Sequence, residues 1–156
     1  MAAHPAWTRR WLTEADFDAI SRAITAAEAR TSAEIRVHLE RHVKHRRWGG
    51  RVDALTRARR LFTHLGMHRT AERHGVLIYL ALEDRKLAIV GDEGIHVKVG
   101  DAYWETARDA TIERLRESRA VDGIVAAVQE VGRVLAQHFP RRPDDVDELP
   151  GEVSVR

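Results

Sequence analysis

The sequence contains no cysteine, and none of its apolar runs is long enough to cross a membrane. The absence of cysteine excludes disulfide frameworks, thiol nucleophiles, zinc–thiolate sites and iron–sulfur clusters together. Any bound metal must therefore be held by imidazole, carboxylate or carbonyl groups. The longest apolar stretch, from Val76 to Leu82, has the length of a strand and falls far below the ~20 residues that a bilayer span requires.

Signals for export and for several common chemistries are also missing. Residues 1–11 have no long apolar core before their basic pair, unlike a secretory signal, so a cytoplasmic location is expected. The sequence has no phosphate-cradling glycine loop, no dinucleotide fingerprint and no Gly-x-Ser-x-Gly nucleophile motif. A net charge of only +2 argues against a nucleic-acid partner bound through charge alone.

The 156 residues suit one domain of ordinary size. Residues 1–12 are expected to form an N-terminal arm, and residues 13–139 the folded domain. Residues 140–156 contain three of the four prolines and five acidic residues, without periodicity, and predict a flexible acidic tail.

Apolar spacing predicts two helices in the first half of the chain. Thr13 is a candidate N-cap with Asp16 three residues later, and apolar residues at helical spacing extend the helix from Glu14 to about Ala29. A second helix is predicted over Leu55–Leu65, with Gly66 as the residue that ends it.

Strands are predicted between and after these helices. Ala33–Leu39 alternates apolar and polar residues, which indicates a strand with one face at least partly solvated. Gly75–Leu82 is almost wholly apolar, as in a central strand, and Lys86–Val90 completes an antiparallel hairpin with it. Ile95–Val99 is compatible with a short strand or a turn of helix, and its alternation favours the strand.

Two more helices follow, carrying apolar residues from Trp104 to Leu115 and from Ile124 to Leu135, with Asp101 as the N-cap of the first. A strand, a helix and a second strand normally form a right-handed parallel crossover. The fold class is therefore α/β, with a mixed sheet of about four strands packed between α-helices.

This topology brings several polar residues to one edge of the sheet. The starts of the first two strands and the end of the third share one rim, which collects Glu34, His68, Glu72, His74, Asp92, Glu93, His96 and Asp101. Carboxylates near carbonyls suit a hard cation such as Ca²⁺ or Mg²⁺. A bound cation would also support phosphate-ester hydrolysis. The simpler alternative is that Asp92 and Glu93 are solvated turn residues.

Histidines and a basic loop leave further alternatives open. His68, His74 and His96 admit a transition metal or haem, although the spacing of His68 and His74 places them on no common helical face. Residues 36–60 contain nine Lys or Arg against two acids, which makes the opposite rim basic. Within that stretch, Arg46, Arg47 and Trp48 suggest an acidic ligand, and the alternative is a solvated loop.

Several of these stretches together resemble the TPM domain family. Thr31–Val37 is similar to that family's Glu-x-x-Thr-Gly-Ala-x-Ile-x-Val segment. Leu61–Gly66 followed by His74–Ala81 resembles its helix and Asn-Gly-Val-Leu strand, and Lys86–Gly91 with Asp101 resembles its strand ending in glycine and the following aspartate. The resemblance covers about residues 13–139.

The resemblance implies an α/β sandwich and, as in some members, a Ca²⁺ site in an acidic cleft at the end of the sheet. On this chain the cleft would use Asp92, Glu93 and Asp101, with Glu34. The family includes a thylakoid-lumen member credited with acid phosphatase activity and membrane-anchored receptor modulators. Without a signal peptide or membrane helix, this chain resembles the small soluble bacterial members. Its Gly91–Gly94 turn is one residue longer than the family's Gly-Tyr-Gly.

The leading hypothesis is a TPM-domain protein whose acidic rim binds a divalent cation, with calcium as the expected ion, and regulates or binds a protein partner. One alternative is a metal-assisted phosphatase acting on phosphate esters. The other is a binding module that uses its histidines for haem or metal, or its basic loop for an acidic ligand.

Overall fold

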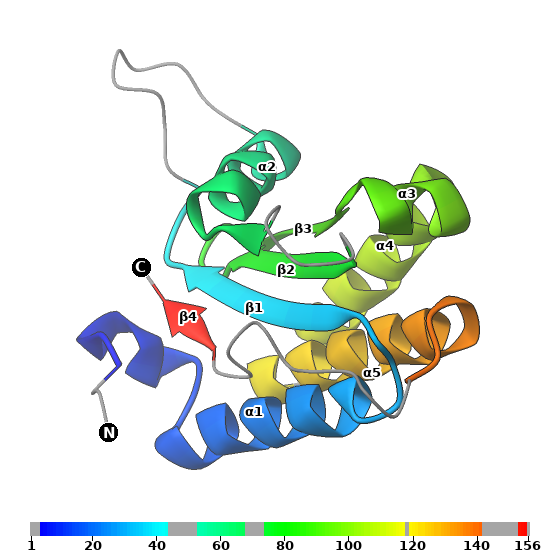
Figure 1. Cartoon of the computed structure of the whole chain (residues 1–156). Coiled ribbons are helices and arrows are strands. Elements are labelled where there is room, and N and C mark those ends of the chain that lie inside the picture. Colours follow the sequence, from blue (N-terminus) through cyan, green and yellow to red (C-terminus); the bar gives the residue numbers. More distant parts are fainter. Residues whose placement is uncertain (1–3, 44–52, 68–73, 118, 142–152, 156) are drawn as a thin grey trace.

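The structure, a computed structural model, describes residues 4–43, 53–67, 74–117, 119–141 and 153–155. Within these residues a four-stranded mixed sheet has the strand order β3-β2-β1-β4. β1 pairs in parallel with β2 and β4, and β2 pairs antiparallel with β3 (Figure 1). The strands are β1 (Glu34–Glu40), β2 (Gly75–Ala81), β3 (Lys86–Gly91) and β4 (Ser154–Val155).

Helices cover both faces of this sheet, as Figure 1 shows. The helix α2 packs on one face, and α1, α4 and α5 share the apolar core on the other. This arrangement confirms the predicted α/β class with a mixed sheet between helices. The helical elements are the 3₁₀ helix η1 (Ala6–Arg10), α1 (Glu14–Glu28), α2 (Ala54–His64), α3 (Glu93–Val99), α4 (Asp101–Glu117) and α5 (Ala120–His138).

The first helix forms as its sequence pattern predicts. The Thr13 hydroxyl accepts from the Asp16 backbone N–H at 3.0 Å, and the Asp16 carboxylate accepts from the Thr13 N–H at 2.9 Å, which completes a capping box. Phe17, Ile20 and Ile24 are buried along one stripe of the helix. The end of α2 also matches its prediction, since Gly66 has φ +75, a value that glycine adopts freely.

The strand predicted over Ile95–Val99 is wrong, because these residues belong to α3. Asp92 caps this helix by accepting from the Ile95 N–H, and the chain therefore leaves β3 directly into a helical turn. In the helix, the alternating apolar residues lie on different faces, so that Ile95 is buried whereas Val97 is 76% exposed.

Both ends of the chain contribute elements that the sequence patterns did not indicate. The predicted arm over residues 1–12 contains η1, and Leu12 is buried in the main core. Within the stretch predicted as a tail, Ser154 and Val155 pair with His38 and Leu39 as β4.

The central strand is buried along its full length, as predicted, and its two faces belong to different cores. Val76, Ile78 and Leu80 face α1 and α5, and Leu77 and Tyr79 face α2.

Within the described part of the chain, no helix combines the length and apolarity needed to cross a bilayer.

The α1–α5 contact depends on a glycine. A Cβ added to Gly132 would lie 2.7 Å from the Ala27 Cβ, which cannot move without shifting the helix backbone. We expect Gly132→Ala to lower the free energy of unfolding by about 1–3 kcal/mol through overpacking, measured by urea denaturation. The double variant Gly132→Ala/Ala27→Gly restores the space and should recover much of the loss. A single variant as stable as wild type would contradict this close contact.

Candidate functional site

The three chain segments predicted to share one rim do meet there. The β1–β2 register places Glu34 opposite Gly75, and the Glu34 N–H donates to the His74 carbonyl at 2.9 Å. The Asp92 N–H donates to the Gly75 carbonyl at 3.0 Å. The start of β1, the start of β2 and the end of β3 are therefore adjacent.

Asp92 organises this rim through both oxygens of its carboxylate. One oxygen accepts from the Gly75 N–H at 2.7 Å and the other from the Ile95 N–H at 3.2 Å. Burial raises the pKa of Asp92, and these two backbone hydrogen bonds offset only part of that effect. Asp92 thus joins β2 to α3, and these bonds limit what it can offer to a cation.

The other predicted rim residues differ in accessibility. Glu34 is buried, with 4% of its surface exposed, and the ring of His74 packs against Phe139 with the centroids 4.1 Å apart. Glu93 and His96, in contrast, are exposed on α3. These two are the described candidates that a ligand in solvent reaches directly.

Several predicted residues lie outside what the structure describes. This applies to His68, Glu72, Arg46, Arg47 and Trp48, and to the side chain of Asp101, which is the first residue of α4. Among the residues that are described, no group of three His, Asp or Glu side chains is arranged to hold a metal ion. A cation at this rim would therefore rely on fewer described carboxylates, supplemented by carbonyl groups.

A groove with a volume of about 810 Å³ runs along β3, from the rim toward the hairpin turn. We call it the β3 groove. Its walls come from the beginning of α2, from α3 and from α4. Three basic residues line it, namely Arg59, Lys86 and Arg108, together with five acidic residues: Asp53, Asp92, Glu93, Glu105 and Asp109.

Backbone groups of β3 and one side chain in the β3 groove have no hydrogen-bond partner among the described residues. Since β3 is an edge strand and the Asp92 N–H bonds to Gly75, the alternation of an antiparallel ladder turns the N–H and C=O groups of Leu87, Ile89 and Gly91 outward. Trp104, which is 5% exposed, also lines the groove, and its indole N–H has no hydrogen-bond partner among the described residues. The groove therefore offers both carbonyl acceptors and a buried donor.

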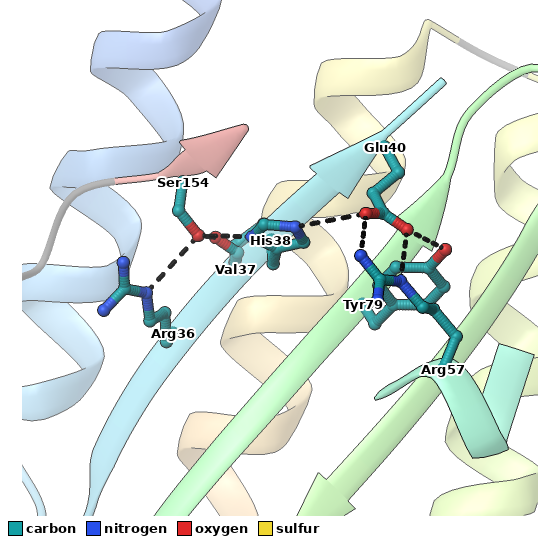
Figure 2. Close-up of polar contacts among 7 residues, drawn as sticks. All are labelled: Arg36, Val37, His38, Glu40, Arg57, Tyr79 and Ser154. Carbon is teal, nitrogen blue, oxygen red and sulfur yellow. Dashed lines mark hydrogen bonds and ion pairs between the residues drawn. The ribbon is translucent and has the colours of Figure 1, made fainter. Parts of the chain in front are cut away.

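A second polar cluster, which the sequence patterns did not indicate, lies between the sheet and α2 (Figure 2). Glu40 of β1 accepts two hydrogen bonds from the Arg57 guanidinium, at 3.0 and 2.7 Å, and one from the Tyr79 hydroxyl at 2.7 Å. His38 lies next to it, with Nε2 3.8 Å from the Glu40 carboxylate and Nδ1 2.7 Å from Ser154 Oγ. We call these five residues the Glu40 cluster.

Ser154, His38 and Glu40 follow one another in the order of a hydrolase triad. However, His38 and Glu40 are each 1% exposed, and 3.8 Å is too long for a hydrogen bond between imidazole and carboxylate. The Glu40 cluster instead ties four elements together, β4, β1, β2 and α2. The alternation of β1 predicted a partly solvated face, and this was wrong because Arg57 and Tyr79 supply buried partners for its polar residues.

Electrostatics in the Glu40 cluster favour the charged carboxylate. Burial by itself raises the pKa of Glu40, but the hydrogen bonds from Arg57 and Tyr79 and the adjacent His38 outweigh it and lower the pKa to about 2. Burial and the same carboxylate raise the pKa of Tyr79. The carboxylate therefore stays ionised through the neutral and mildly acidic range, as a buried ion pair requires.

The low pKa of Glu40 predicts a specific loss of stability in acid. Because its pKa falls from 4.5 to about 2 on folding, its contribution is complete above about pH 5 and is lost as the pH drops toward 2. We expect Glu40→Gln to be less stable than wild type by about 2–3 kcal/mol at pH 7, a difference that shrinks toward pH 2. Urea unfolding at several pH values measures it. Glu117→Gln, on the surface of α4, should track wild type, and a pH-independent deficit in Glu40→Gln would contradict the assignment.

Taken together, the mixed sheet and the helices on both of its faces define an α/β sandwich domain. The TPM domain family model matches residues 8–134. This match covers most of the chain, and the protein belongs to the TPM domain family, as its sequence resemblance implied.

Solved structures agree with this assignment. The chain is similar to the NMR structure of BA42 from the psychrophilic bacterium Bizionia argentinensis, with 39% identity, a TM-score of 0.80, and coverage of 93% of this chain and 95% of that one. No curated protein gives a significant match.

Two more distant NMR structures share the fold. The N-terminal domain of a P. gingivalis protein has 17% identity and a TM-score of 0.66, with coverage of 83% of this chain and 79% of that one. The N-terminal domain of the cg2496 protein from Corynebacterium glutamicum has 20% identity and a TM-score of 0.59, with coverage of 86% of each chain.

Proposed function

We propose that this TPM-domain protein binds a divalent cation, with calcium as the expected ion, in the acidic part of the β3 groove. The observation that carries the proposal is the groove itself, in which five carboxylates lie beside the outward-facing carbonyls of an edge strand. Carboxylate and backbone carbonyl oxygens are the ligands that Ca²⁺ takes in proteins.

Glu93 and Glu105 are the described side chains best suited to this role. Both line the β3 groove and both are exposed, and Glu105 makes no ion pair with any described residue. Asp92 contributes less, because its oxygens already accept two backbone hydrogen bonds and its pKa is raised. Asp101 stays a candidate from its place at the start of α4.

Of the five carboxylates, Asp53 caps α2, Asp92 accepts two backbone hydrogen bonds and Asp109 pairs with Arg108, and this small ligand set implies weak binding. Calcium affinity in proteins rises with the charge and rigidity of the ligand set, and sites with few charges have dissociation constants of about 10⁻⁴–10⁻³ M. The occupancy of such a site would change with the calcium concentration in the millimolar range. Ligands on both α3 and α4 would hold these helices together across Gly100, whose φ of +83 marks a sharp turn between them. Calcium would then control how α3 and α4 are held, which is the basis on which we propose a regulatory role toward a partner.

A calcium titration followed by ¹H–¹⁵N NMR tests the proposal. Backbone amides of Gly91–Glu93 and of the first turns of α4 should shift saturably at about millimolar calcium. Removing one ligand charge in Glu93→Gln or Glu105→Gln should weaken binding about five- to ten-fold. Glu113→Gln, on the outer surface of α4, is the matched control and should bind as wild type does.

A lack of response up to about 10 mM calcium, or equal binding by all three variants, would overturn the proposal. The phosphatase alternative requires the same cation, so a rim that binds no divalent ion removes that alternative as well.

A further inference from the structure

A second pocket, with a volume of about 360 Å³, lies at the end of the sheet where the β2–β3 hairpin turns. Four separate parts of the chain line it: the segment from η1 into α1, the hairpin, the end of α4 and the start of α5. Its cationic lining residues are Arg9, Arg10, Arg85, Lys86 and Arg119, and we call it the basic pocket. The acidic rim lies at the other end of β3.

The charge in the basic pocket is only partly compensated: Arg10 lies 3.9 Å from Glu83, and Arg119 pairs with Asp16. Its single lining carboxylate, Asp16, already accepts two hydrogen bonds from Arg119 and the N-terminal bond of α1. Arg9, Arg85 and Lys86 make no ion pair with any described residue. Like charges gathered from three segments, η1, the hairpin and the start of α5, repel one another, and an anion between them would relieve that repulsion.

Two further features of the basic pocket favour an anion. The indole N–H of Trp11 is buried and has no hydrogen-bond partner among the described residues. The N-cap of α5, Arg119, makes no side-chain cap, and Ala120, the first residue of this 19-residue helix, lines the pocket, so the N-terminus of α5 lies at this site. Such a helix end adds partial positive charge.

Arg85 is held in an unfavourable backbone conformation at this pocket. Its φ of +53 is the only positive value at a non-glycine residue in the described part of the chain. Glycine would adopt this conformation without steric cost. An arginine at this position carries a steric cost that glycine would avoid. We take this cost as a sign that the Arg85 side chain has a role in the pocket.

We propose that the basic pocket binds a small oxyanion that carries at least two negative charges, such as an organic phosphate or a polycarboxylate. Arginine guanidinium groups match the oxygens of both in a bidentate manner. The volume lies in the lower range of small-molecule pockets, about 300–1,000 Å³. A nucleic acid or a membrane would call for positive charge spread over a wider face than this concave site provides.

The indole N–H resonance of Trp11 reports on binding at this site directly. We would titrate inorganic pyrophosphate and, separately, citrate into the metal-free protein, with the resonance assigned through Trp11→Phe. The Trp11 indole signal should shift saturably, and that of Trp104, in the β3 groove, should not. A response to pyrophosphate alone identifies phosphate as the ligand group, and a response to citrate alone identifies carboxylate.

Matched variants distinguish a specific anion site from nonspecific electrostatic attraction to a basic protein. Arg9→Ala should weaken binding about ten-fold, whereas Arg60→Ala, which removes the same charge from the exposed surface of α2, should leave it unchanged. Arg85→Gly should also weaken binding about ten-fold and yet melt no lower than wild type, because glycine fits the turn. This pairing distinguishes a ligand-binding arginine from a structural one.

Three results would overturn the proposal. The first is an unmoved Trp11 signal up to about 10 mM of both anions, well above the range of ordinary metabolite sites. The second is an equal loss of binding in Arg60→Ala. The third is binding of anionic vesicles or duplex DNA without any response to the small anions. Because no divalent ion is present, these outcomes are independent of the calcium proposal.

Discussion

The arrangement of the rim depends on one carboxylate, that of Asp92. Its two oxygens hold the first N–H of β2 and the N-terminal turn of α3, so a single side chain fixes where the hairpin ends and where the next helix begins. The same two hydrogen bonds offset part of the cost of burying this carboxylate, whose pKa is raised by that burial. It also determines that Glu93, the next residue, leaves the sheet on the exposed side and reaches the β3 groove.

The Glu40 cluster performs the corresponding task on the other half of the sheet. Its buried ion pair joins α2 to β1, and the His38–Ser154 contact joins β1 to β4. A buried pair of this kind adds little net stability compared with apolar packing, but removal of one partner is costly because the other charge is left unpaired. The cluster therefore specifies which elements meet, whereas the two apolar cores supply most of the driving force.

Local patterns predicted the elements whose signals are contained in one segment. The capping box of α1, the buried run of β2 and the topology that gathers Glu34, His74 and Asp92 were all readable in the sequence. The misses involve partners distant along the chain. His38 and Glu40 look solvated until Arg57 and Tyr79 are placed beside them, and the five cations of the basic pocket come from three segments that span Arg9 to Arg119. For α3, the capping role of Asp92 outweighed the alternation that favoured a strand.

The central claim is that the rim presents Glu93 and its neighbours to a cation in the β3 groove, and crystallography of the calcium-soaked protein tests it most directly. The account predicts an anomalous peak in the groove with a Glu93 oxygen at about 2.3–2.6 Å, while Asp92 keeps its bonds to Gly75 and Ile95. An ordered groove without an anomalous peak at saturating calcium, or a calcium ion bound only elsewhere on the molecule, would contradict it.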